Sequence, residues 1–421
     1  LVLFLVFSAS GQVTENINFN HGGCSFGATL NKPAGAGPYK TIVLVPGSGQ
    51  NDRHGTLQMS GDNINCLYPG LMGQTLKIYK DLAENLSDSG YAVLRYDELT
   101  ISCPNFSGAF NYENVFLPAM SALDYLKSRS DIDTNNLILM GHSEGAQLIS
   151  YMASIRDDIK ATISLAGART PFDSILAYQT VYIAKTCGKD TSQAKNQAQQ
   201  ILNYFDIVRK GNYTSSTPSF GGVAPAVWHK YITVADSVAI LYQQNSLPSL
   251  FVGFGSDINV PLSELDRFEQ SLSGDFTFNR IAGLNHYMTT AMHPKVSRIV
   301  ADTIVYWLRN RTIGQLEPLS TQAQIFCYPN PFTTSTEFYF QHNKSNQDIE
   351  VSLDIYSING VLVKRIQGNY FDNGYLIGPI SWDGKDEYGG QLSAGMYIAK
   401  LGVSSSDGDF TSKSIRIILL P

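Results

Sequence analysis

Five residues, Gly141-His142-Ser143-Glu144-Gly145, separate an apolar run typical of a buried strand, residues 136–140, from a helical pattern over residues 146–153. Small residues two positions before and two after a serine let strand and helix pass closely in a sharp turn. The serine hydroxyl is then pushed out above the sheet, as in a nucleophile elbow. An ordinary strand-to-helix turn is the alternative, because three fixed positions also match by chance. The flanking patterns favour Ser143 as a nucleophile.

The length and composition of the chain limit the classes of protein that it can be. A chain of 421 residues is long for one compact domain, so two domains are expected. The hydrophobic fraction of 43% with 16% charged residues is typical of a globular protein. The formal net charge of -6, without a local run of Lys and Arg, argues against nucleic-acid binding.

The chain begins with LVLFLVFSASGQ, an apolar core followed by small residues. This is the shape of the second half of a secretory signal, so residues 1–12, which lack Met and a charged start, are predicted to be a truncated signal peptide. An N-terminal strand is the alternative. No other segment approaches about 18 unbroken apolar residues, so we expect no transmembrane segment in the mature protein, which should be soluble.

The cysteines are odd in number and show neither CxxC nor metal-ligand spacing; they are Cys24, Cys66, Cys103, Cys187 and Cys327. Export would permit a disulfide. Cys66 and Cys103 flank one predicted βα unit, on loops near the expected catalytic face, and are therefore the expected pair. The alternative is that all the cysteines are free and mostly buried.

Residues 13–312 alternate apolar strands with helical patterns, which predicts an α/β domain with a mainly parallel sheet. Strands are expected at residues 26–30, 40–45, 91–96, 136–140, 161–166, 249–252 and 276–278, and helices at residues 76–86, 146–153 and 296–308. Over about residues 171–246 the alternation of strands and helices stops, and the pattern is helical. Such an insertion between late strands predicts a lid over the active site; a merely structural insertion is the alternative.

A second domain follows a change in composition. Residues 313–325 are polar and aperiodic, as linkers are. Residues 326–421 show short alternating strands, such as residues 350–356, separated by turn signals such as Asn359-Gly360. This pattern predicts a small all-β, immunoglobulin-like sandwich.

A nucleophilic serine needs a base that takes its proton and an acid that orients the base. In folds with a nucleophile elbow the chain order is Ser, then Asp or Glu, then His, each after a late strand. Asp257 stands just past the predicted strand at residues 249–252, and His286 follows the last predicted strand. The other candidates fit less well, since they lie in helical patterns, before Asp257 or in the β module; they are Asp266, His229, His293 and His342.

An acyl-transfer reaction also needs two donors for the oxyanion of its tetrahedral intermediate. The backbone N–H of Glu144, directly after the nucleophile, is one expected donor. The second is expected from the loop after the strand at residues 40–45, where Gly47 and Gly49 give backbone freedom and Ser48 is the best placed. A phosphate-binding loop is the alternative, but the stretch GSGQND lacks the spacing of nucleotide fingerprints. The reaction needs no metal or organic cofactor.

Four motifs in order resemble one branch of bacterial serine α/β-hydrolases, the carboxylesterase and acyl-thioesterase-like enzymes. They are Pro46-Gly47-Ser48-Gly49 with Asp52-Arg53, Leu94-Arg95-Tyr96-Asp97, the elbow, and Asp257-Ile258-Asn259-Val260-Pro261. The resemblance covers about residues 15–312. The chain departs from it at Glu98-Leu99-Thr100, where the family has an Arg-Gly-x-Gly-type turn, and at His54, where the family has a second Asp. Both loops are expected to border the substrate cleft.

The β module has a resemblance of its own. Its motifs are similar to the sorting domain of type IX secretion; they are Cys327-Tyr328-Pro329-Asn330-Pro331-Phe332, Tyr356-Ser357-Ile358-Asn359-Gly360, Ser381-Trp382-Asp383-Gly384-Lys385-Asp386 and Ser393-Ala394-Gly395-Met396-Tyr397. The resemblance implies export by type IX machinery, to the medium or cell surface of a Gram-negative bacterium. A carbohydrate-binding sandwich is the alternative. Asn330, Trp382 and Asp383 are interpreted as turn and core residues.

Together the patterns predict a secreted serine hydrolase of carboxylic esters that acts through Ser143, His286 and Asp257. A peptidase or amidase with the same triad and a non-catalytic surface binding protein are the alternatives. The lid is expected to set specificity for a small-molecule or polymer ester. Trp228 and Tyr231, and with less support Tyr204 and Phe205, are aromatic candidates for the lid's underside; a plain lid core is the alternative for each.

Overall fold

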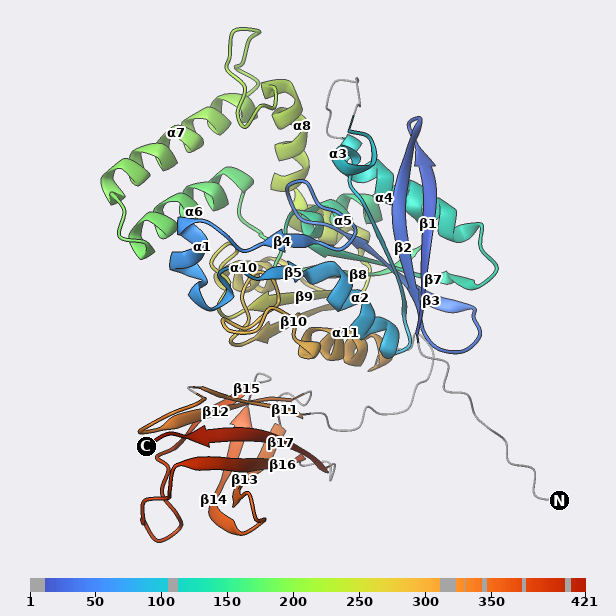
Figure 1. The fold of residues 1–421 in the computed structure, drawn as a ribbon. Coiled ribbons are helices and arrows are strands. Elements are labelled where there is room, and N and C mark those ends of the chain that lie inside the picture. The colour runs from blue at the N-terminus through green and yellow to red at the C-terminus, as the bar shows by residue number, and fades with distance from the viewer. Residues whose placement is uncertain are drawn as a thin grey trace, which may run out of the picture. The chain divides into compact units, whose positions relative to one another are not determined.

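The computed structural model describes residues 12–104, 113–310, 323–328, 330–342, 347–372, 376–405 and 410–421. It divides into two compact units, Leu1–Trp307 and Leu308–Pro421, drawn in Figure 1. The predicted signal peptide and most of the predicted linker lie outside the described residues. Within the described residues, no helix combines the length and the apolar character needed to cross a bilayer.

The first unit is built on an eight-stranded sheet in the order β1-β2-β6-β3-β7-β8-β9-β10. Its strands are β1 (Val13–His21), β2 (Cys24–Lys32), β3 (Tyr39–Val45), β6 (Ala92–Tyr96), β7 (Ile132–His142), β8 (Ile159–Leu165), β9 (Ser249–Phe254) and β10 (Phe276–Ile281). β1 pairs with β2, and β2 with β6, in antiparallel fashion, whereas every pair from β6 to β10 is parallel. The predicted mainly parallel sheet is therefore confirmed.

Helices cover both faces of this sheet (Figure 1). Every residue of β6 and of β9 is buried, as expected for strands with helices on both sides. The helices outside the lid are α1 (Asp62–Leu67), α2 (Ile78–Asp88), α3 (Leu99–Ser102), α4 (Glu113–Lys127), α5 (Glu144–Ser154), α10 (Ser263–Ser271) and α11 (Arg298–Asn310). A 3-10 turn at Pro69–Leu71 and the short pair β4 (Thr56–Gln58) and β5 (Thr75–Lys77) complete the unit.

Between β8 and β9 the chain forms the helices α6 (Phe172–Thr186), α7 (Thr191–Arg209), α8 (Pro225–Asp236) and α9 (Val238–Asn245). In Figure 1, α7 and α8 stand away from the sheet. Asp190 caps α7 by accepting hydrogen bonds from the backbone N–H groups of Ser192 and Gln193. Rings from these helices pack on one another, and Phe205 at their centre is fully buried. This helical insertion has an aromatic core of its own.

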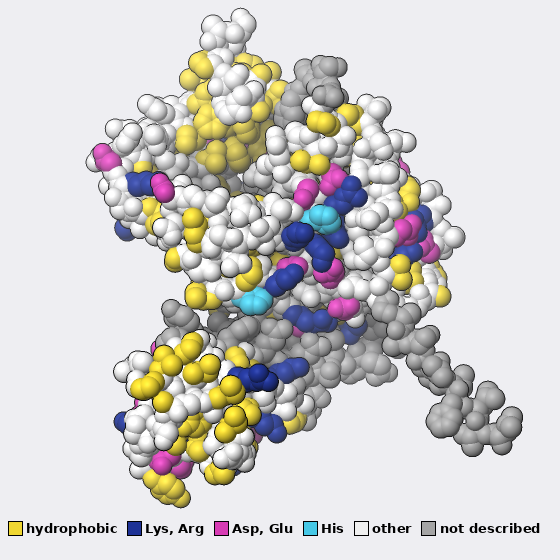
Figure 2. All heavy atoms as spheres, in the orientation of Figure 1, with side chains coloured by type: hydrophobic (Ala, Val, Ile, Leu, Met, Phe, Trp, Pro, Cys, Tyr) yellow, Lys and Arg dark blue, Asp and Glu magenta, His cyan; other side chains and the backbone are white. Residues whose placement is uncertain are grey.

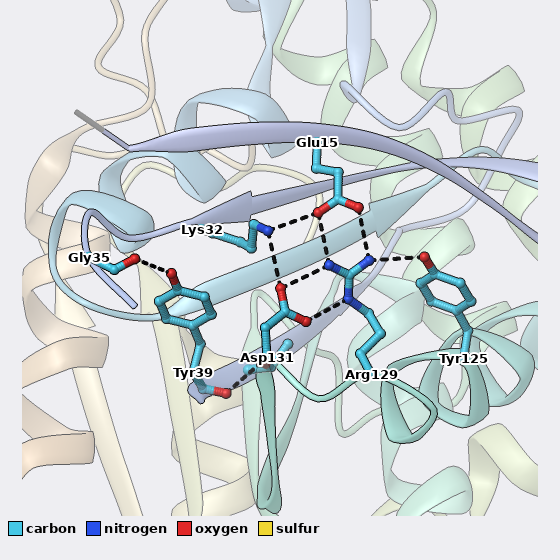
Figure 3. A network of polar contacts seen from close by, with 8 residues as sticks. Glu15, Lys32, Gly35, Tyr39, Tyr125, Arg129 and Asp131 are labelled. Carbon is cyan, nitrogen blue, oxygen red and sulfur yellow. Dashed lines mark hydrogen bonds and ion pairs between the residues drawn. The ribbon is translucent and has the colours of Figure 1, made fainter. Parts of the chain in front are cut away.

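Ionic contacts hold the edge hairpin of β1 and β2 to the middle of the sheet (Figure 3). The guanidinium of Arg129 contacts both oxygens of Glu15 on β1 and both oxygens of Asp131, which precedes β7, at 2.8–2.9 Å. Lys32, at the end of β2, contacts the same two carboxylates at 2.9 and 3.1 Å. These cations lower the pKa of both Glu15 and Asp131. The network fixes β1, a strand with too few apolar residues for the sequence pattern to predict.

The structure pairs the cysteines differently from the prediction. Cys24 at the start of β2 bonds to Cys103 after α3, and Cys66 in α1 bonds to Cys187 at the end of α6. The expected Cys66–Cys103 pair is therefore wrong, and so is the alternative of free cysteines throughout. The error has a topological cause, because the antiparallel β1–β2 hairpin brings Cys24 to the loop that follows β6. Cys327 is a free thiol.

The second unit consists of two antiparallel sheets with a shared apolar core. One sheet has the order β11-β12-β15, formed by β11 (Ala323–Tyr328), β12 (Thr336–His342) and β15 (Leu376–Trp382). The other has the order β14-β13-β16-β17, formed by β13 (Gln347–Ser357), β14 (Leu362–Asp372), β16 (Gly395–Ser405) and β17 (Phe410–Leu419). Trp382 lies in the core, whereas Asn330 and Asp383 hydrogen-bond neighbouring backbone groups. The predicted all-β sandwich is confirmed.

Candidate active site

Ser143 sits between the end of β7 and the start of α5 with φ 55° and ψ -116°, a strained conformation for a residue with a side chain. The two glycines around it have no room for a Cβ. A Cβ on Gly141 would lie 2.2 Å from the carbonyl oxygen of Gly145, and a Cβ on Gly145 would lie 2.3 Å from that of Val45. The turn therefore has the steric form that the pentapeptide predicts for a nucleophile elbow.

The structure brings the predicted base and acid together. His286 Nδ1 and Asp257 Oδ2 lie 2.8 Å apart, and both side chains are buried. The other oxygen of Asp257 accepts the backbone N–H groups of Asn259 and Val260 at 2.8 and 2.9 Å. Because Oδ1 is held by the backbone, Oδ2 is fixed toward the imidazole. The alternative acid Asp266 instead pairs with Arg280 on β10.

His142, the residue directly before Ser143, links the elbow to the loop that carries His286. Its ring centroid lies 4.8 Å from that of His286, and its Nε2 lies 2.9 Å from the His286 carbonyl oxygen. A carbonyl only accepts, so Nε2 carries the proton. Burial lowers the pKa of His142 to about 3, so the ring is neutral. Its Nδ1 must then accept, and the Tyr79 hydroxyl lies 3.2 Å from it.

Tyr79, on α2, completes this chain of hydrogen bonds. Its hydroxyl accepts the backbone N–H of Gly47 at 2.8 Å while it donates to His142 Nδ1. The chain therefore joins the loop after β3, the elbow and the loop of His286. Sequence reasoning missed Tyr79 and His142, because the contacts join segments far apart in the chain. A buried tyrosine is not distinguishable from other core residues by pattern.

Replacing Tyr79 with phenylalanine is expected to lower the free energy of unfolding by about 1–3 kcal/mol, because it leaves the buried Gly47 N–H and His142 Nδ1 without their shared partner. Urea unfolding followed by tryptophan fluorescence measures the change. Tyr306→Phe is the matched control, since Tyr306 is 47% exposed on α11, and its effect should stay within about 0.5 kcal/mol. Equal effects of the two substitutions would contradict the role of this hydroxyl.

The loop after β3 stands beside the elbow. A Cβ on Gly47 would lie 3.1 Å from the Ser143 Cβ, so the loop backbone passes close to the nucleophile. The N–H of Gly47 is taken by Tyr79, which makes Ser48 the next backbone donor along the loop. Ser48, Ser143 and Glu144 line one small cavity of about 80 Å³.

Asn51 holds the same loop in place. Its side-chain amide donates to the carbonyl oxygen of Gly47 at 2.8 Å, and its backbone N–H donates to Glu98 Oε2 at 2.6 Å. Arg53 contacts Asp97 through its side chain, at 2.6 and 3.0 Å, and through its backbone N–H. The motifs around Asp52-Arg53 and Arg95-Tyr96-Asp97 therefore meet in space and fix the loop against the end of β6.

A larger cavity of about 420 Å³ adjoins the small one, and Ser48, Glu144, Phe172 and Tyr231 line both. Trp228 lines the larger cavity as well, so both aromatic residues predicted for substrate binding lie on the cleft. Tyr204 and Phe205 line neither cavity and pack in the lid's aromatic cluster. Sequence reasoning missed Tyr96 and Glu98 as lining residues, although it expected their loop to border the cleft.

Two carboxyl groups in this cleft have shifted pKa values. Burial raises the pKa of Glu144 to about 7, while a hydrogen bond with Tyr231 acts in the opposite direction. Burial also raises the pKa of Glu98 to about 8, partly opposed by the hydrogen bond from the Asn51 backbone. Among the described residues, no group of three or more His, Cys, Asp and Glu is placed to hold a metal ion.

The strand order, the antiparallel second strand and the strained serine between β7 and α5 define an α/β-hydrolase fold. Residues 120–245 match the family model described as "BAAT / Acyl-CoA thioester hydrolase C terminal". Over 289 residues the chain is 27% identical to Esterase EstD of Thermotoga maritima, an alignment that covers 66% of this chain. The chain spans 63% of the length of that curated relative.

Two solved structures show some similarity to this chain. Est1E from Butyrivibrio proteoclasticus, solved with ferulic acid bound, is 15% identical, with coverage of 71% of this chain and 100% of that chain and a TM-score of 0.44. The acylaminoacyl peptidase of Pyrococcus horikoshii is 13% identical, with coverage of 74% of this chain and 43% of that chain and a TM-score of 0.47.

Proposed function

We propose that this protein is a serine hydrolase that cleaves carboxylic esters through Ser143, His286 and Asp257. The observation that carries the proposal is a strained elbow serine together with a buried His–Asp pair 2.8 Å apart, whose imidazole centroid lies 4.8 Å from that of His142, the residue before the serine. The similarity to an esterase over 66% of the chain supports an ester as the substrate.

The proposed reaction gives each of these residues a role. His286 Nε2 takes the proton of Ser143 Oγ as the oxygen attacks the ester carbonyl carbon. Asp257 holds the Nδ1 proton of the imidazole and stabilises the charge that develops on the ring. The N–H groups of Ser48 and Glu144 bind the oxyanion, the latter at the N-terminus of α5. His286 then protonates the leaving alcohol, and water hydrolyses the acyl-enzyme through the same groups.

A substrate panel tests this function against its alternatives. We expect the full chain to hydrolyse p-nitrophenyl esters, graded by acyl length, faster than aminoacyl p-nitroanilides, and a fluorophosphonate probe to label Ser143. Faster cleavage of the anilides would favour a peptidase or amidase. If the protein neither hydrolyses an ester nor reacts with the probe, the proposed function is wrong and a non-catalytic binding protein remains.

We also propose that residues 326–421 direct export through type IX secretion machinery, to the medium or the cell surface of a Gram-negative bacterium. The motifs of this module and its own apolar core support the proposal, as do the two disulfides of the first unit, which suit an oxidising compartment. In a type IX-competent host, the full chain should appear outside the outer membrane, and a chain that ends at residue 325 should stay in the periplasm. Equal export of both would contradict the proposal.

A further inference from the structure

The larger cavity is a second lobe of the candidate active-site cleft. Ser48 and Glu144 line both lobes, and Ser143 lines the smaller one, so the larger lobe lies next to the candidate nucleophile. The lid closes the larger lobe from α6 and α8, and the loop after β6 closes it from the body of the unit. Figure 2 shows hydrophobic side chains gathered on the lid around α8.

The lining of this lobe contains acidic side chains and no basic ones among the described residues. It is mostly apolar, yet it contains the carboxyl groups of Glu98 and Glu144, and none of the described residues that line it is Lys, Arg or His. The two hydrogen bonds that Asn51 donates to Glu98 both end on Oε2. Carboxylates in a mostly apolar lining without a cationic partner are costly, so a cationic ligand would stabilise this arrangement.

Tyr96 supplies an independent observation. It is only 2% exposed, it lines the same lobe, and its hydroxyl has no hydrogen-bond partner among the described residues. A buried hydroxyl in a native protein is normally paired. A ligand with polar atoms in the lobe would offer this hydroxyl a partner.

Aromatic rings form another part of the lining. Phe172, Trp228 and Tyr231 contact one another with centroid distances of 5.2–5.4 Å, and all three line the lobe. The faces of such rings attract cations, including quaternary ammonium groups, and the attraction grows when water is excluded. Aromatic rings and carboxyl groups in one lining match the two kinds of contact that an ammonium group makes.

We propose that this lobe binds an ammonium group of the substrate, so that the preferred esters carry a cationic end, with Glu98 and Glu144 as the charge partners. The inference rests on the proposed ester hydrolase function. It also explains why the loop after β6 departs from the family that it resembles at Glu98, where the departure places a carboxyl group in the cleft.

Inhibition by two alcohols of the same shape tests the inference. Choline and 3,3-dimethylbutan-1-ol differ by a charged nitrogen in place of a carbon, and both compete with p-nitrophenyl acetate for the cleft. At pH 8.5, where the pKa values of about 8 and 7 leave Glu98 and Glu144 ionised, we expect the inhibition constant of choline to be at least about tenfold lower.

The ratio of the two inhibition constants separates charge recognition from loop distortion. Glu98→Gln and Glu144→Gln should each bring the ratio toward one, whereas distortion of the loop that Asn51 holds would weaken both inhibitors alike. Glu269→Gln, on α10 and away from the cleft, is the matched control and should keep the wild-type ratio. A wild-type ratio near one, or a ratio unchanged in both cleft variants, would overturn the inference.

If the protein is not an ester hydrolase, the experiment gives a different result. In that case p-nitrophenyl acetate is not hydrolysed at all. The same pair of alcohols is then compared by the shift that each produces in the melting temperature. Stabilisation by choline alone, lost in Glu98→Gln, would support the ammonium site, and equal shifts would reject it.

Discussion

Replacing Ser143 with alanine is expected to lower kcat for p-nitrophenyl acetate by about 10⁴–10⁶-fold, because the acyl-enzyme cannot form without the hydroxyl oxygen. We expect α5 to stay intact in this variant, because the Ser143 side chain makes no capping hydrogen bond. The Ser143 backbone N–H, which donates to the Leu165 carbonyl oxygen, is kept by alanine. Steady-state kinetics on the full chain, with the melting temperature as a check of folding, measures the effect.

Ser154→Ala is the matched control for this substitution. Ser154 ends α5, is exposed, and its hydroxyl bonds only to the carbonyl oxygen of Tyr151. Its loss should leave kcat within about twofold of the wild type, as most surface substitutions do. A Ser143→Ala protein that retained wild-type activity on the ester would show that another nucleophile carries the reaction.

Replacing Asp257 with asparagine is expected to lower kcat by about 10⁴-fold with little change in stability. The asparagine oxygen can still accept the backbone N–H groups of Asn259 and Val260, which keeps the loop in place. Its amide group then faces His286 Nδ1 and donates to it, which forces the proton onto Nε2. An imidazole in that tautomer cannot take the proton of Ser143.

Asp266→Asn distinguishes this tautomer effect from a general loss of negative charge. Asp266 is the other acidic residue that sequence order allowed, and it is about half exposed in its pair with Arg280. Its substitution should leave kcat within about twofold of the wild type. If both asparagine variants lost activity equally, the acid of the triad would be misassigned.

The elbow, Asp257 and His286 could be predicted from the sequence because each follows a strand that is recognisable by itself. The apolar runs at β7, β9 and β10 show where these strands end. In a parallel sheet the carboxyl ends of the strands lie at one edge. The helical insertion between β8 and β9 could be predicted because the alternation of strands and helices stops there, whereas its role as a lid stays a prediction. Local sequence patterns were therefore sufficient to predict which residues follow the ends of these strands.

The remaining features depend on contacts between distant segments, for which a single sequence contains no local signal. β1 is one example, since most of its residues are polar and its Glu15 is held by Arg129 from another part of the chain. The disulfide pairing is another, because loop proximity within one βα unit favoured Cys66 with Cys103. The hairpin of β1 and β2 instead delivers Cys24 to that position.

The bond between Cys66 and Cys187 has a mechanical consequence for substrate entry. It fastens the turn between α6 and α7 to α1, in the body of the unit, across 121 residues of sequence. Because this disulfide holds the turn between α6 and α7, the helical insertion cannot move away from the body of the unit as a whole. We expect an opening of the helical insertion to move α8, which carries Trp228 and Tyr231 of the larger cavity, more than the turn that the disulfide holds. Substrates would then enter from the side of the larger cavity.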